Sequence, residues 1–153
     1  MQTLLQKLQF KTATNVLLWQ APENIVPLLD WPAHVVVHYT MPAGGVDFVL
    51  AFVHTQADVV LAAQQWLPAL ALENDVPLWF CYIKGSSKTF TTDINRDKGW
   101  EPLTPFNLEP VRQIAVNNDW SALRFRSVAF IKTMQRSFAT TAQGIAKVQA
   151  QKK

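Results

Sequence analysis

The chain has 153 residues, 49% of them hydrophobic and 16% charged, which predicts one well-packed domain and excludes a disordered chain. A single cysteine excludes an internal disulfide. With no secretion signal and no apolar run near the ~20 residues of a membrane span, we expect a cytoplasmic protein without a membrane partner. The formal net charge of +3 conceals a basic end, since the residues from Arg124 onward include seven Lys or Arg and no Asp or Glu.

Four short apolar runs in the first half of the chain are predicted to be buried strands, because parallel strands covered on both faces are apolar throughout. They are 16–20, 35–39, 47–53 and 77–83. Pro or Gly residues, which are typical of turns, stand in the segments between them. Two later strands, 111–116 and 121–126, flank a short polar turn and are expected to pair antiparallel at the sheet edge.

Helices are predicted between these strands. One starts near Gln56, where Thr55 and Asp58 have the spacing of a capping box, and Pro68 should kink or split it. Shorter helices are expected around 23–29 and over 93–98, the latter with Thr92 as its N-cap and Gly99 at its end. This alternation predicts a three-layer α/β fold with a doubly wound, mostly parallel, Rossmann-like sheet and an antiparallel C-terminal hairpin.

The α/β domain is expected to span residues 1–127. From 128 to 153, apolar residues spaced three and four apart predict a basic C-terminal helical arm. The arm could pack on its own domain or pair with a second chain to form a homo-oligomer, and the pattern leaves both open.

Four segments, some of them within the predicted strands, resemble those of a known family: 47–53, 78–84, 92–97 and 119–125. With them, the chain from Leu5 to Arg136 resembles an uncharacterised family of small bacterial domains that looks like a shortened S-adenosylmethionine-dependent methyltransferase fold. The resemblance implies a methyltransferase-like sheet. In such enzymes a glycine-rich turn follows the first strand and an acidic residue ends the second, whereas here 20–24 has no glycine and 39–41 no acid. No cofactor is therefore predicted, and S-adenosylmethionine stays the alternative.

The loop 84–88 is the preferred ligand site, because ligands of open α/β sheets bind beyond the carboxyl ends of the strands. Its polar side chains are those of Lys84, Ser86, Ser87 and Lys88. Hydroxyl groups and positive charge beside the flexible Gly85 suit a phosphate or a carboxylate. His54 and Thr55, after the third strand, could contact the same ligand, His54 as a general base. The alternatives are a polar loop without a ligand, and a capping or packing role for His54 and Thr55.

A second group of candidates is basic. Arg112, Arg124 and Arg126 form a basic surface if their strands pair with these side chains on one face. Such a surface could contact phosphates, although no nucleic-acid-binding motif accompanies it. His34 and His38 share a strand face but lack a third ligand, so no metal is predicted.

The function expected from these features is that of a methyltransferase-like domain that lacks catalysis and binds a small anionic ligand or a protein partner. Two alternatives stay open. One is a divergent S-adenosylmethionine-dependent methyltransferase, and the other is a module that binds nucleic acid or an acidic partner through the basic arm.

Overall fold

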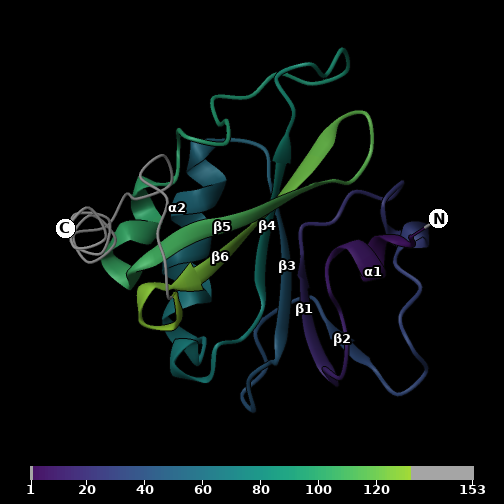
Figure 1. Ribbon diagram of the computed structural model, residues 1–153, viewed down its shortest axis with the longest axis vertical. Coiled ribbons are helices and arrows are strands. Elements are labelled where there is room, and N and C mark those ends of the chain that lie inside the picture. Colours follow the sequence, from purple (N-terminus) through teal and green to yellow (C-terminus); the bar gives the residue numbers. More distant parts are fainter. Residues whose placement is uncertain (1, 132–153) are drawn as a thin grey trace.

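A mixed sheet of six strands forms the centre of the molecule (Figure 1). The computed structural model describes residues 2–131, and its strands are β1 (Asn15–Trp19), β2 (Val36–His38), β3 (Phe48–Val53), β4 (Leu78–Ile83), β5 (Leu108–Ala115) and β6 (Trp120–Ser127). They lie in the order β2-β1-β3-β4-β6-β5. The first four strands run parallel, whereas β6 is antiparallel to β4 and to β5.

Each of the six predicted strands is found in the structure, and the last two pair antiparallel as expected. β3 and β4 are buried along their whole length at the middle of the sheet, as their apolar runs predict. β5 begins earlier than predicted, at Leu108, because Pro110 is tolerated on this edge strand beside a register shift between Pro110 and Arg112.

The expected three-layer, doubly wound Rossmann-like class is wrong, because too few helices cover the sheet. Among residues 2–131 only α2 (Gln56–Gln65) exceeds two turns, and α1 (Leu4–Lys7) is a single turn. Prolines give the physical reason between β1 and β2, where Pro22, Pro27 and Pro32 leave room for only a short 3-10 turn. Apart from α2, loops and 3-10 turns stand where a doubly wound fold would have helices, so the fold is a strand-rich mixed sheet.

The remaining helical segments are 3-10 turns: Val26–Leu28, Leu67–Ala69, Leu72–Asn74, Glu101–Phe106 and Val128–Phe130. The helix expected over 93–98 is absent, and a turn closed by a bridge between Asn95 and Lys98 takes its place. α2 ends before Pro68, so the proline splits that segment as predicted. No helix within residues 2–131 is both long and apolar enough to cross a bilayer. From residue 132 onward, the predicted arm lies outside the residues that the structure describes.

The sheet separates two apolar cores, since successive side chains of a strand point to opposite faces. Along β3, Val49 and Ala51 belong to the core that α2 covers. Leu50 and Phe52 belong to the other core, which includes Leu5 of α1. Both cores are rich in aromatic rings, which meet mostly edge to face.

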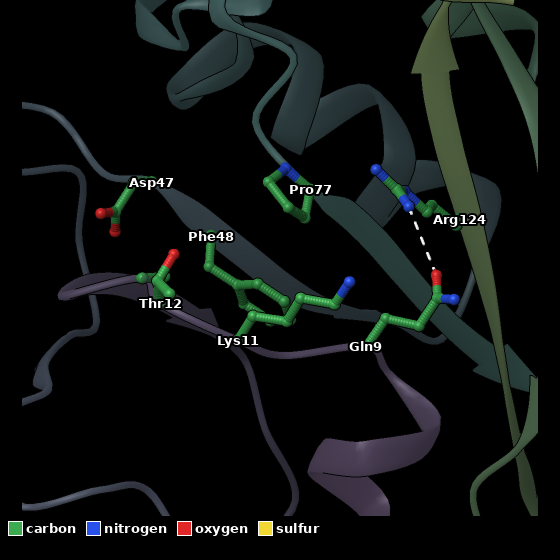
Figure 2. Close-up of a pocket in the computed structure, with 8 residues that line it drawn as sticks. Gln9, Lys11, Thr12, Asp47, Phe48, Pro77 and Arg124 are labelled. Atoms are coloured by element: carbon green, nitrogen blue, oxygen red, sulfur yellow. Dashed lines mark hydrogen bonds between the residues drawn. The ribbon is translucent and has the colours of Figure 1, made fainter.

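The segment before β1 is fastened to this second core. Leu8 is buried, and its carbonyl accepts a hydrogen bond of 3.1 Å from the indole Nε1–H of Trp79, itself fully buried in β4. Gln9 then adopts a left-handed conformation with a φ of 57°, which turns the chain toward β1. Residues 9–13 therefore lie beside the start of β3, the residue before β4 and the side of β6 (Figure 2).

Candidate functional site

The loop 84–88 lies beyond β4, as predicted, but much of its polarity is used within the fold. The Ser87 hydroxyl donates to Oδ1 of Asp119 at 2.8 Å and accepts from the backbone N–H groups of Thr89 and Phe90. A hydroxyl has one donor and two acceptor lone pairs, so these bonds fill its capacity. The backbone N–H of Lys84 donates to the Asp119 carbonyl. Ser87 is therefore a structural residue of the loop.

Ser86 and Lys88 do line a pocket, of about 460 Å³, together with Thr89, Asn118 and Asp119. Both Lys88 and Ser86 are exposed. The carboxylate of Asp119 carries a negative charge into the same space, where it opposes the charge of Lys88. This pocket is polar but has no excess of positive charge among its lining residues.

His54 and Thr55 hold the junction between β3 and α2. The Asp58 carboxylate accepts hydrogen bonds from the backbone N–H groups of both residues, and its Oδ2 lies 2.8 Å from the His54 nitrogen. The half-buried His54 ring meets the Trp120 ring edge-on with centroids 5.0 Å apart, and its carbonyl accepts from the Thr92 hydroxyl. These contacts give both residues a packing and capping role, and their role toward a ligand stays a prediction.

The three predicted arginines are brought together on the β5–β6 hairpin. Arg112 stands opposite Arg124 in the register, and Arg126 is two residues further along β6. Arg126 is paired, since its Nε lies 3.0 Å from Oδ1 of Asp75 and its Nη2 lies 2.6 Å from Oδ2. This hydrogen-bonded ion pair raises the pKa of Arg126. Asp75, at the end of a 3-10 turn, carries no local sequence signal for this role.

Arg124 differs from its neighbour, because it has no carboxylate partner within residues 2–131. Its Nε atom is buried without a hydrogen bond. Its Nη1 donates to the Gln9 side-chain oxygen at 3.5 Å, which is longer than an ordinary N–H···O bond. Desolvation lowers the pKa of Arg124, and the nearby charges of Arg126 and Arg112 lower it further, against an opposite effect of Asp75. Arg124 is thus a half-buried cation that is poorly solvated and weakly partnered.

The guanidinium of Arg124 faces a pocket of about 490 Å³ at the amino ends of the central strands. The pocket is lined by Gln9, Lys11, Thr12, Ala13, Asp47, Phe48, Pro77 and Arg124. Figure 2 shows the ammonium group of Lys11 and the guanidinium of Arg124 extending toward the same part of this space, beside Pro77. Lys11 makes no hydrogen bond or ion pair within the described part of the chain. Two cations therefore converge on one pocket from different segments.

Asp47 lies at the other end of this pocket (Figure 2). Its carboxylate accepts from the backbone N–H groups of Thr14 and Asn15, the latter at 2.8 Å, and from the Thr14 hydroxyl. These bonds tie the start of β1 to the start of β3, so Asp47 has a clear structural role. Its charge restricts the positive end of the pocket to the space near Arg124 and Lys11.

Comparison with family models, curated proteins and solved structures found no match for this chain. The resemblance to methyltransferase-like domains therefore stays a prediction. At the turn after β1, Gln20 has a φ of 57°, a left-handed conformation in the turn where the methyltransferase pattern has glycine.

No group of three or more potential metal ligands is found within residues 2–131. His34 precedes β2 and is exposed, while the ring of His38 contacts Asn15 Oδ1 at 3.1 Å. The two histidines thus do not share the strand face on which the sequence placed them. The expectation that no metal binds remains a prediction.

Sequence reasoning named Arg124 as part of a basic surface and missed the residues that surround it. Gln9, Lys11 and Thr12 belong to a polar stretch before β1 that has no motif. Gln9 and Arg124 are 115 positions apart, and no local pattern reports a contact at that separation. The signal that could have found the site is Arg124 itself, a charged residue in a strand whose other residues are mostly buried.

Proposed function

We propose that this protein binds a small anionic ligand, one that carries a carboxylate or a phosphate group, in the pocket beside Arg124. The observation that supports the proposal most is the state of the Arg124 side chain, half-buried next to a pocket with only a long hydrogen bond to Gln9. Burial of a cation without a strong partner is unfavourable, and an anion in the pocket offsets that cost.

Lys11 supports the same ligand class. Its ammonium group has no partner in the described chain and extends toward the space that Arg124 faces (Figure 2). Gln9 adds an amide that can donate to an anion's oxygen atoms, whereas Thr12 lies at the Asp47 end of the pocket (Figure 2). The proposed activity is binding, because an anion held by these donors needs no reacting side chain from the protein.

The pocket at loop 84–88 is the alternative location for the same ligand class, and substitutions in the two pockets are expected to have different effects on binding. Titration calorimetry with inorganic phosphate and with acetate measures binding to the whole chain. We expect Arg124→Met and Lys11→Met each to weaken binding about tenfold or more, since hydrogen bonds to charged groups contribute about 1.5–3 kcal/mol. Lys88→Met should leave the affinity unchanged.

A lysine on another part of the surface gives the matched control. Lys98 is exposed in the turn after Asp97, so Lys98→Met removes the same charge without touching either pocket. Loss of binding in Lys88→Met but not in Arg124→Met would move the site to loop 84–88. Absence of binding by either anion to the unaltered protein would refute the proposed function.

A further inference from the structure

The Arg124 pocket is lined by two cationic side chains that extend toward the same space from different segments (Figure 2), and this arrangement restricts the kind of anion that fits. Lys11 comes from the segment before β1 and Arg124 from β6, so one ligand group must meet donors from two directions. A carboxylate has one charge and two oxygen atoms in a plane. A phosphate dianion has two charges and oxygen atoms in a tetrahedral arrangement, which allows separate oxygens to meet each cation.

Resting on the function proposed above, we infer that the ligand group is a dianionic phosphate, either inorganic phosphate or the phosphate of a small monoester. The hairpin favours the second charge, because Arg112 and Arg126 both act on Arg124 as like charges. Asp75 compensates Arg126 through their ion pair. Within residues 2–131, neither Arg112 nor Arg124 has a carboxylate at hydrogen-bond distance. A doubly charged ligand relieves this repulsion more than a singly charged one.

The contact between Gln9 and Arg124 indicates how the phosphate enters. The Gln9 side-chain oxygen lies 3.5 Å from Nη1 of Arg124, and Gln9 itself is exposed. A bond of this length is weak, so an anionic oxygen displaces it readily. Rotation of the Gln9 amide then presents its N–H donors to the phosphate.

Asp47 and Phe48 set the other limits of the ligand. Phe48 is 1% exposed and is packed against Phe10, so it closes the pocket without offering a broad apolar wall. The Asp47 carboxylate at the far end repels a second anionic group. The ligand therefore has one phosphate at the Arg124 end and a small neutral or polar remainder.

Calorimetry with phenyl phosphate and phenyl sulfate tests the charge directly, since the two ions have similar shape and differ in charge at pH 8. We expect phenyl phosphate to bind at least about tenfold more tightly at pH 8. With a second phosphate pKa of about 6, the dianion falls to about a tenth of the total at pH 5, so the phosphate affinity should fall about tenfold. Phenyl sulfate, which keeps its charge, reports any change in the protein over the same pH range.

Variants separate the two cations. Lys11→Met should weaken phenyl phosphate more than phenyl sulfate and so remove most of the preference between them, whereas Arg124→Met and Arg124→Lys should weaken both ligands to a similar degree. Circular dichroism verifies that each variant is folded, and Lys98→Met is the control. Inorganic phosphate, measured beside phenyl phosphate, distinguishes the free ion from an ester as the better ligand.

The outcomes distinguish this inference from the function on which it rests. Equal affinity for the two phenyl ions, with both lost in Arg124→Met, would overturn the dianion inference and leave the anion-binding function in place. Failure of every anion to bind in an Arg124-dependent way would overturn both.

Discussion

Replacement of Arg124 by Met should stabilise the protein in the absence of ligand, although the residue belongs to the proposed site. The buried Nε of Arg124 has no hydrogen bond, and such an unsatisfied group costs about 1–3 kcal/mol. Met keeps a side chain of similar length for packing and removes the repulsion from Arg112 and Arg126. We expect the free energy of unfolding to rise by about 1 kcal/mol, which corresponds to an increase in Tm of about 3 °C.

Arg126→Met is the matched comparison on the same strand. It breaks the two-bond pair with Asp75 and leaves that carboxylate without its partner, so unfolding should become easier by about 1 kcal/mol. Urea unfolding of both variants, followed by tryptophan fluorescence, measures the two changes under the same conditions. A loss of stability in Arg124→Met as large as that in Arg126→Met would refute the reasoning, because it would mean that Arg124 is well satisfied in the unliganded fold.

Three further outcomes are expected. Burial raises the pKa of the Cys81 thiol well above its ordinary value, so at alkaline pH the unfolded chain loses this proton while the folded chain keeps it. The free energy of unfolding should therefore decline as the pH rises beyond about 8.5, and urea titrations should show a shallower decline in Cys81→Ala; identical slopes would contradict this assignment. Trp79→Phe removes the hydrogen bond to Leu8 and part of a filled core, so thermal unfolding should reveal a loss of about 2–3 kcal/mol, and a loss below ~0.5 kcal/mol would argue against that anchor. Saturating S-adenosylmethionine should leave Tm unchanged because Gln20 occupies the turn after β1, whereas a stabilisation near 2.7 kcal/mol at ~100 times Kd would show that the cofactor binds.

The inner strands β1, β3 and β4 can be predicted from the sequence because each is a short apolar run that is largely buried in the sheet. β3 and β4 show this most clearly, since every one of their residues is buried. α2 is predictable for a local reason as well, because Thr55 and Asp58 mark its start. Features that depend on residues close together in the sequence were therefore predicted correctly.

The layers of the fold could not be inferred in the same way. Alternating strands and polar segments look alike whether the connections are helices or 3-10 turns, and the prolines between β1 and β2 decide the matter. The turn at Asn95–Lys98 was mistaken for a helix because Thr92 and Gly99 have the positions of helix caps. Gly99 instead has a φ of +104° and adjoins Ile94 in the core.

The Arg124 pocket was only partly predictable, for a different reason. Period-two spacing places Arg124 and Arg126 on one face, but the sequence does not reveal that Asp75 pairs with only one of them. The sequence also does not reveal that residues 9–13 lie beside Arg124. The distinction between a structural arginine and a ligand-facing arginine arises from contacts between distant segments.

The contact of Gln9 with Arg124 joins positions that are synthesised more than a hundred residues apart. During translation, the segment before β1 and the strands β1 to β4 leave the ribosome before β6 exists, so the pocket lacks the wall that carries Arg124 until the hairpin has been added. Any ligand held there is bound only by a chain that is folded from α1 to β6. Its binding energy would therefore oppose complete unfolding, and would slow hydrogen exchange in the central strands as much as in the residues that touch it.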